Sequence, residues 1–180
     1  MSLFIALLRG INVSGQKLIK MTDLKELFKA QGFQDVQTYI QSGNVIFYST
    51  EKSIEKLENI IQTAIRKKFG FDVGVLVIAP DKIGYVIKNN PFIKKKKEID
   101  RLYVTFLSKQ PSAENIKKFS SIDYSPEEYE IEGQLVFLYF PNGYGKAKLN
   151  NNLFENKLKV ESTTRNWKTI NKLWELSNIS

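Results

Sequence analysis

The sequence predicts an α+β fold built from a repeated order of strands and helices. Short apolar runs bounded by Gly, Pro or Asn have the length of strands, and stripes of Leu, Ile and Phe at helical spacing separate them. The order strand–helix–strand–strand–helix–strand occurs twice. We therefore expect two tandem ferredoxin-like (βαββαβ) subdomains packed into one compact body, with a linking helix and an extra C-terminal helix. The expected parts are residues 1–79, the linking helix and basic loop 80–99, and residues 100–180.

The first half is expected to begin with a strand and to contain two amphipathic helices. Thr22 is expected to cap the first helix, which places Leu24, Leu27 and Phe28 on one face, and Gly32 closes it. The second helix carries an apolar stripe from Ile54 to Ile65. The expected elements are a strand 3–8, a helix 22–32, a hairpin of strands 36–41 and 44–48, a helix 53–70 and a strand 73–78.

The second half repeats that order after a linking helix that Pro80 starts and Asn89-Asn90-Pro91 stops. The last helix is expected to start at Thr164 and to place Trp167, Ile170 and Trp174 on one face. The other expected elements are a strand 102–107, a helix 112–122, a hairpin of strands 128–132 and 135–140, a helix 151–158 and a short strand 159–162.

Strand composition indicates which strands are central. The runs 3–8, 45–47, 102–107 and 135–140 are apolar almost throughout, whereas 36–41 and 128–132 alternate with polar residues. A strand that is apolar on both sides needs cover on both faces of its sheet. We therefore expect the two halves, or the two extra helices, to cover the second face of each sheet.

Composition excludes several classes of protein. With 42% apolar and 26% charged residues, the 180-residue chain is neither a disordered tail nor a collagen-like repeat. It has no Cys and no His, which removes disulfides, thiolate or imidazole zinc sites, Cys nucleophiles and Ser-His-Asp chemistry. No apolar run approaches the roughly 20 residues of a membrane span. We expect a cytoplasmic protein without a membrane partner.

The net positive charge says less about function than the absence of Cys and His does. Lys and Arg outnumber Asp and Glu by 27 to 19, for a net charge of +8, and half of this excess comes from the run Lys94–Lys97. Such a run is typical of a solvated connector, although it also suits a basic interaction surface. Glu128, Glu130 and Glu132 alternate along one expected edge strand. They could bind magnesium, but a charged edge that resists aggregation explains them more simply.

Four polar connections are candidate sites. The segment Arg9–Lys17 joins a strand to a helix and offers backbone N–H groups and a guanidinium to an anion, or is an ordinary turn with Gly10 and Gly15 at positive φ. The others are the hairpin tip 41–44, the loop 141–148 and the segment 163–167. The loop 141–148 resembles a P-loop but lacks its first Gly and its Ser or Thr, which leaves a basic anion nest. Thr163 or Thr164 is expected to cap the last helix.

Three motifs carry a resemblance to a known family. They are Leu8-Arg9-Gly10-Ile11-Asn12-Val13, Thr38-Tyr39-Ile40-Gln41-Ser42-Gly43-Asn44-Val45 and Thr163-Thr164-Arg165-Asn166-Trp167. In this order they resemble a bacterial family of uncharacterised proteins, domain of unknown function 1697, over nearly the whole chain. The resemblance implies a fold of two ferredoxin-like subdomains and assigns no biochemical role. It also gives more weight to the polar loop residues.

These observations favour a site for an anionic, phosphate-bearing ligand, which is a small molecule such as a nucleotide or metabolite, or a nucleic-acid backbone. The loops around Arg9, Ser42 and Arg165 are expected to converge on it. One alternative is a metal-independent enzyme that uses a residue such as Tyr39 or Lys146, and another is an interaction module that uses Lys94–Lys97. The sequence points to no cofactor and no metal. The candidate ligand-binding residues are Arg9, Asn12, Ser42, Asn44, Lys146, Arg165 and Asn166.

Overall fold

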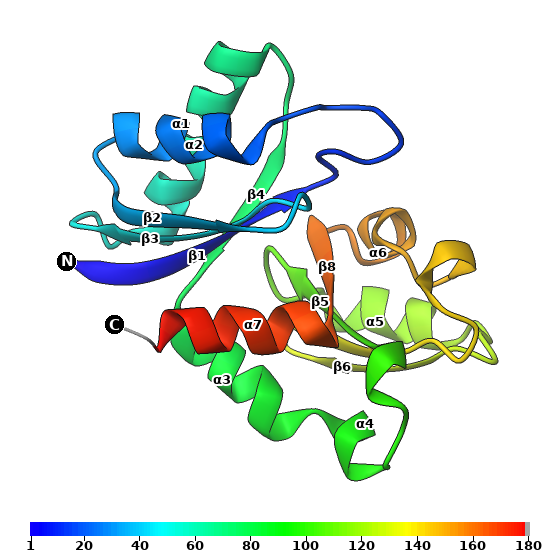
Figure 1. Cartoon of the computed structure of the whole chain (residues 1–180). Coiled ribbons are helices and arrows are strands. Elements are labelled where there is room, and N and C mark those ends of the chain that lie inside the picture. The colour runs from blue at the N-terminus through cyan, green and yellow to red at the C-terminus, as the bar shows by residue number, and fades with distance from the viewer. Residues whose placement is uncertain (179–180) are drawn as a thin grey trace. The chain divides into compact units, whose positions relative to one another are not determined.

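The structure, a computed structural model of the chain, describes residues 1–178 and confirms the α+β class (Figure 1). The chain divides into two compact units. Unit 1 comprises Met1–Tyr85 with the C-terminal segment from Lys172, and unit 2 comprises Val86–Asn171. The expected division at residues 80 and 100 stays a prediction. Over residues 1–178, no helix combines the length and the apolar character that crossing a membrane requires.

Unit 1 contains one antiparallel sheet with strand order β2-β3-β1-β4. As expected, the apolar strands β1 and β3 are central, and the alternating strand β2 lies at the edge. Its elements are β1 (Ser2–Arg9), α1 (Met21–Ala30), β2 (Gln34–Tyr39), β3 (Asn44–Ser49), α2 (Ile54–Phe69), β4 (Gly74–Ile78) and the first part of α3 (Pro80–Asn89).

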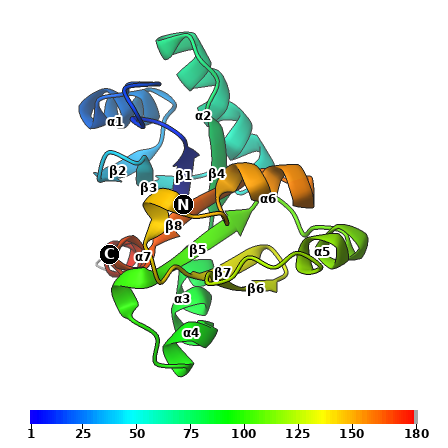
Figure 2. The same cartoon turned by 90° about the vertical axis from the view of Figure 1, so that its right-hand side faces the viewer.

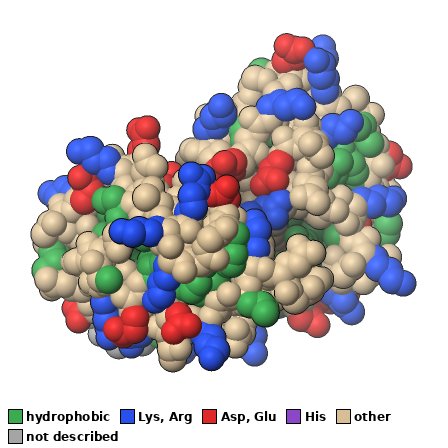
Figure 3. Space-filling view, turned by 90° about the horizontal axis from the view of Figure 1, so that it is seen from above, with side chains coloured by type: hydrophobic (Ala, Val, Ile, Leu, Met, Phe, Trp, Pro, Cys, Tyr) green, Lys and Arg blue, Asp and Glu red, His purple; other side chains and the backbone are tan. Residues whose placement is uncertain are grey.

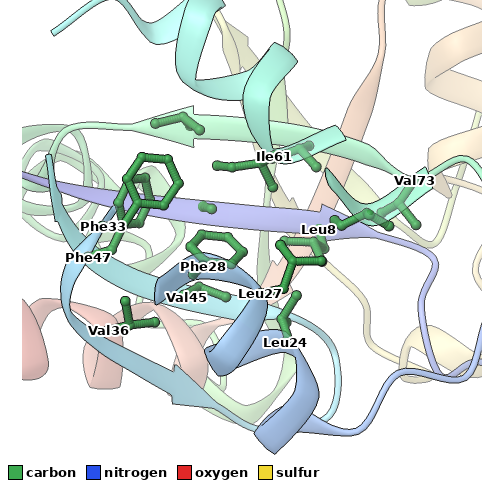
Figure 4. Close-up of a cluster of buried hydrophobic side chains, with 14 of the residues drawn as sticks. Leu8, Leu24, Leu27, Phe28, Phe33, Val36, Val45, Phe47, Ile61 and Val73 are labelled. Carbon is green, nitrogen blue, oxygen red and sulfur yellow. The ribbon is translucent and has the colours of Figure 1, made fainter. Parts of the chain in front are cut away.

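The core of unit 1 lies between the sheet and the pair α1 and α2, which cover one face (Figure 1). Figure 4 shows Leu24, Leu27 and Phe28 of α1 pointing toward the sheet. The ring of Phe28 meets that of Phe47 edge to face at 5.3 Å between centroids. Side chains on the opposite face, such as Ile5 of β1, are also buried, which confirms that the central strands are covered on both sides.

Unit 2 repeats this arrangement with strand order β6-β7-β5-β8, again antiparallel throughout. Helices α5 and α6 lie beside the sheet (Figure 2), and their buried Phe119 and Phe154 pack with Phe140 in one cluster. Its elements are α4 (Pro91–Lys94), η1 (Ile99–Arg101), β5 (Leu102–Leu107), α5 (Ala113–Ser120), β6 (Glu128–Glu132), β7 (Leu135–Tyr139), η2 (Tyr144–Lys146), α6 (Asn151–Leu158), β8 (Ser162–Asn166) and the first part of α7 (Trp167–Ser177).

The start of α1 and the buried stripe of α2 differ from the sequence expectation. Helix α1 begins at Met21 with Lys20 at the N-cap, so Thr22 lies inside its first turn. Helix α2 begins after Ser53 and ends at Gly70 as expected, and the Ser53 hydroxyl accepts the Lys56 N–H at 3.3 Å. However, Ile54 is exposed, because the buried stripe of α2 starts at Leu57.

The largest difference between the expected and the observed elements lies just before the last helix. The expected short strand 159–162 is wrong, because Lys159 ends α6 in a left-handed conformation and the strand β8 begins at Ser162. The last helix starts at Trp167, so Thr163 and Thr164 are strand residues rather than caps. The helix buries Leu173 where Trp174 was expected, and Trp174 is 36% exposed.

Candidate functional site

In unit 1, the loop that follows β1 is fastened to the turn between β2 and β3 by Asn12. The Asn12 Nδ2 donates to the carbonyl oxygen of Gln41 at 2.8 Å and to that of Ile19 at 2.9 Å. The Asn12 Oδ1 accepts the N–H of Ile19 at 2.8 Å. The loop 9–17 and the turn 41–44, which the sequence singled out separately, therefore meet at Asn12. We call this contact the Asn12 junction.

Gly43 packs directly against the same loop. Its φ of +81° favours glycine, and a Cβ there would lie 2.7 Å from Ile11 Cδ1 and 2.8 Å from Leu8 Cβ. The Leu8 N–H also donates to the Gly43 carbonyl oxygen at 2.8 Å. Residue 43 thus has no room for a side chain, which explains the Gly in this turn.

The other candidate residues of unit 1 belong to the same loop and the same hairpin turn. Asn44 is fully buried, and its Nδ2 donates to the Tyr39 carbonyl oxygen at 2.9 Å and to Ser42 Oγ at 3.1 Å. Arg9 ends β1, is half-buried, and pairs with Gly74 of β4. The amides of Asn12 and Asn44 thus shape the loops, and Arg9 contributes a positive charge on this part of unit 1. The ligand-binding role of these residues stays a prediction.

In unit 2, Arg165 lies within β8 and not at a helix start, which corrects the sequence expectation. It pairs with Val104 of the central strand β5 and is only 7% exposed. Its Nη1 donates to Thr163 Oγ1 at 2.7 Å and to the Thr164 carbonyl oxygen at 3.0 Å. Burial lowers the pKa of Arg165 from 12.5 to about 10, partly opposed by the nearby Tyr144 hydroxyl.

Asn166 and Lys146 flank this strand in different ways. Asn166 is the residue that caps α7, because its Oδ1 accepts the Thr169 N–H at 2.8 Å. Lys146 lies exposed in η2, two residues after Tyr144. The Tyr144 ring stacks on that of Tyr103 at 5.1 Å between centroids. The loop 141–148 is therefore anchored to β5 by an aromatic contact that the sequence reading did not anticipate.

The sequence also did not predict a hydrogen-bonded network of hydroxyl groups next to Arg165. Thr105 Oγ1 and Thr164 Oγ1 lie 2.7 Å apart across the β5–β8 pair, and Thr164 Oγ1 donates to Asn151 Oδ1 at 2.8 Å. Ser162 Oγ donates to the same Asn151 oxygen at 3.1 Å. Thr105 interrupts an otherwise apolar central strand, and this polar residue in an apolar run was the available signal.

Comparison with known proteins assigns the family. The family model described as "Protein of unknown function (DUF1697)" matches residues 1–137, about three quarters of the chain. The chain belongs to the DUF1697 family. None of the curated proteins matches it.

A solved structure shares the fold of this DUF1697 chain. It is the conserved bacterial protein SP0830 from Streptococcus pneumoniae, which is 23% identical, with a TM-score of 0.77. The match covers 98% of this chain and 99% of the other. At this identity the likeness concerns the fold alone. The family model confirms the family resemblance. The first two sequence motifs lie within its residues 1–137, and the third, residues 163–167, lies beyond them.

The lysine run of this DUF1697 chain is folded against an edge strand of unit 2. The Nζ of Lys95 lies 2.6 Å from Glu130 Oε1, and that of Lys97 lies 2.5 Å from Glu128 Oε1. Lys97 Nζ also lies 4.6 Å from the centroid of the Tyr139 ring. These contacts favour a solvated connector and a charged edge strand. Within residues 1–178, no group of three or more acidic side chains could hold a metal ion.

The sequence also gave no sign of a groove of about 940 Å³ between α1 and α2. Glu26 lines this groove and pairs with Lys29 at 2.9 Å, and this contact lowers the pKa of Glu26 below its ordinary 4.5. The other charged lining residues are Lys56, Lys67 and Lys68.

Figure 3 shows Lys and Arg side chains spread over the face that it presents, with no single basic patch that resembles a nucleic-acid footprint.

Proposed function

We propose that the protein binds an anionic, phosphate-bearing ligand and that Arg165 of unit 2 supplies the main positive charge. The observation that carries this proposal is a guanidinium that is 7% exposed, on a strand next to a central strand. Taking a cation out of water costs several kcal/mol unless its surroundings compensate the charge. Burial also lowers the pKa of this guanidinium to about 10, which shows that the group lies largely out of water. An anion bound beside it would interact with it more strongly than in bulk water.

The hydrogen bonds of Arg165 support the same proposal. Nη1 is held by Thr163 Oγ1 and the Thr164 carbonyl oxygen, so the guanidinium plane is fixed before any ligand arrives. A planar guanidinium fits two phosphate oxygens at once, and a preoriented one loses little entropy on binding. Tyr144 and the exposed Lys146 belong to the neighbouring basic loop and provide a second hydroxyl and a second charge. Arg9 is the corresponding candidate in unit 1.

Calorimetric titration with inorganic phosphate, pyrophosphate and AMP tests this proposal. Arg165→Lys keeps the charge but removes the planar fork, and it should weaken binding about 10- to 100-fold, since hydrogen bonds to charged groups contribute about 1.5–3 kcal/mol. Lys146→Ala should weaken it several-fold. Lys157→Ala, an exposed lysine of α6, is the control and should bind as the parent does. Thermal unfolding checks that each variant is folded.

Two results would reject the proposal. One is that none of the three phosphates binds the parent protein. The other is that they bind it, but Arg165→Lys and Lys146→Ala bind equally well. Turnover of a phosphorylated metabolite by the parent protein would instead favour the enzyme alternative.

We also propose that each unit is a ferredoxin-like subdomain. The support is that strand orders β2-β3-β1-β4 and β6-β7-β5-β8 are identical when each set of four is counted in its own chain order. In both units a helix connects the first strand to the second and another connects the third to the fourth. This is the split βαβ arrangement that the sequence predicts.

A further inference from the structure

Three aliphatic side chains are exposed around the Asn12 junction of unit 1. Val13 is 58% exposed, Leu18 66% and Ile40 46%. Each is the chain neighbour of a residue joined at that junction: Val13 follows Asn12, Leu18 precedes Ile19, and Ile40 precedes Gln41. Because Asn12 Nδ2 binds the carbonyl oxygens of Ile19 and Gln41 together, the backbone segments that carry these three exposed side chains lie close to one point. We call them the junction patch.

The backbone under the junction patch is fixed in an unusual conformation. A β-bridge between Val13 and Gln16 closes a tight turn, and Lys17 Nζ donates to the Asp72 carbonyl oxygen at 2.6 Å. Positive φ angles in non-glycine residues are costly, and they cluster where a protein needs a defined loop shape for function. The loop residues with positive φ are Gly10, Asn12, Ser14, Gly15 and Lys17. The loop therefore presents the patch in one preformed arrangement.

The surroundings of the junction patch are basic. Segment 9–20 contains Arg9, Lys17 and Lys20 and no acidic residue, and segment 36–50 contains no charged residue at all. Asp72, whose carbonyl oxygen Lys17 contacts, pairs its carboxylate with Arg66. A complementary partner must therefore bring apolar side chains flanked by carboxylates.

We propose that the junction patch is a docking surface for an acidic peptide segment of another protein that carries at least two apolar side chains. Exposed aliphatic groups within a basic rim match such a segment in both hydrophobicity and charge. A membrane-surface site typically relies on Trp, Tyr or Phe together with a polybasic cluster, and a site for single-stranded nucleic acid relies on stacking aromatics. The junction patch has neither feature, because its exposed side chains, Val13, Leu18 and Ile40, are aliphatic. The proposal is independent of the Arg165 site.

Selection from a random 16-residue peptide display library on the full chain provides the test. Enriched peptides should be acidic, with at least two apolar residues, and should be measured as synthetic probes by fluorescence anisotropy. The variant Val13→Ser/Leu18→Ser/Ile40→Ser should weaken their binding at least 10-fold, and Lys17→Ala/Lys20→Ala should weaken it and reduce its salt dependence. The matched control, Ile54→Ser/Ile60→Ser, removes two exposed aliphatic side chains from α2 and should leave binding unchanged.

The same variants also test whether a different partner binds the junction patch. The proposal is wrong if no peptide is enriched, or if the enriched peptides bind the triple variant as tightly as the parent. It is also wrong if the triple variant instead loses sedimentation with phosphatidylserine vesicles, retardation of a single-stranded oligonucleotide, or self-association in sedimentation equilibrium. Each of those results would assign the patch to a lipid surface, a nucleic acid or a second copy of the chain.

Discussion

The Asn12 Nδ2 lies 2.8 Å from the carbonyl oxygen of Gln41, 29 residues further along the chain. Two further hydrogen bonds join the same side chain to both backbone groups of Ile19. The φ of Asn12 is +55°, a conformation that Asn tolerates better than most residues. One residue thus fixes the shape of the long loop and attaches it to the neighbouring hairpin turn.

Replacing Asn12 should destabilise unit 1 and loosen the loop. Asn12→Ala removes three hydrogen bonds, each contributing about 1 kcal/mol net, and should lower the free energy of unfolding by about 2–3 kcal/mol. Asn12→Gly loses the same bonds but accepts the positive φ, so it should be about 1 kcal/mol less harmful than Ala. Urea denaturation measures both, and amide exchange should accelerate in residues 10–19. An Ala variant as stable as the parent would contradict this role.

The contact between Asn12 and Gln41 shows why the sequence located this region but did not reveal what holds it together. A polar loop with two glycines after a strand is recognisable from the sequence alone. The partner of Asn12 is 29 residues away, however, and only the folded hairpin brings Gln41 within reach. An amide used to hold backbone and an amide free to bind a ligand look the same in a sequence.

Predictions from local sequence were most accurate for elements whose ends are marked by nearby residues. Strands β5 and β6 have the expected bounds, and α2 lies between its Ser cap and its Gly stop as expected. They failed at Thr163–Asn166, where hydroxyl and amide residues before a Trp-rich helix resemble a cap. The β-branched threonines instead pair with β5, where Thr164 lies opposite Thr105. Tertiary pairing thus decided between two locally reasonable conformations, and it placed Arg165 on a buried strand.

Gly43 should be far less tolerant of substitution than Gly15, although both have positive φ. In Gly43→Ala the new Cβ would meet Leu8 Cβ at 2.8 Å, an atom close to the backbone, whereas Gly15 has open space around it. We expect about 3 kcal/mol of destabilisation at Gly43, from strained φ plus overpacking, and about 1 kcal/mol at Gly15, from φ alone. Urea denaturation of the two variants gives the comparison. Equal losses would show that the close approach to Leu8 is unimportant.

The substitution Gly84→Ala in α3 should destabilise the protein or stabilise it, depending on which residue occupies position 174. A Cβ at Gly84 would lie 2.7 Å and 2.8 Å from two ring atoms of Trp174. Gly84→Ala should therefore destabilise the parent by about 1–2 kcal/mol, although Ala is the better helix former. In a Trp174→Ala background the clash is absent, and the same change should stabilise by about 1 kcal/mol. A double-mutant cycle in denaturant measures the coupling, and an effect of one sign in both backgrounds would refute it.

The contact between Tyr139 and Glu98 should make part of the stability of unit 2 depend on pH. The Tyr139 hydroxyl donates to Glu98 Oε2 at 2.6 Å, which lowers the pKa of Glu98 below its ordinary 4.5 and raises the pKa of Tyr139 above its ordinary 10.0. A carboxyl group whose pKa falls on folding stabilises the protein above its unfolded pKa, and this stabilisation is lost as the pH falls through the folded pKa. For the phenol, stabilisation is present below the unfolded pKa and is lost as the pH rises through the folded one.

Tyr139→Phe removes this hydroxyl and keeps the ring contacts with Phe92 and Lys97. The parent should have the higher Tm at neutral pH, and the difference should shrink below about pH 4.5 and again above about pH 10. Tyr124→Phe is the matched control, because its buried hydroxyl has no hydrogen-bond partner within residues 1–178. Its Tm difference from the parent should stay constant through the acid range. Thermal unfolding by circular dichroism from acid to alkaline pH tests both, and a Tyr139→Phe difference that does not vary with pH would remove Glu98 from the account.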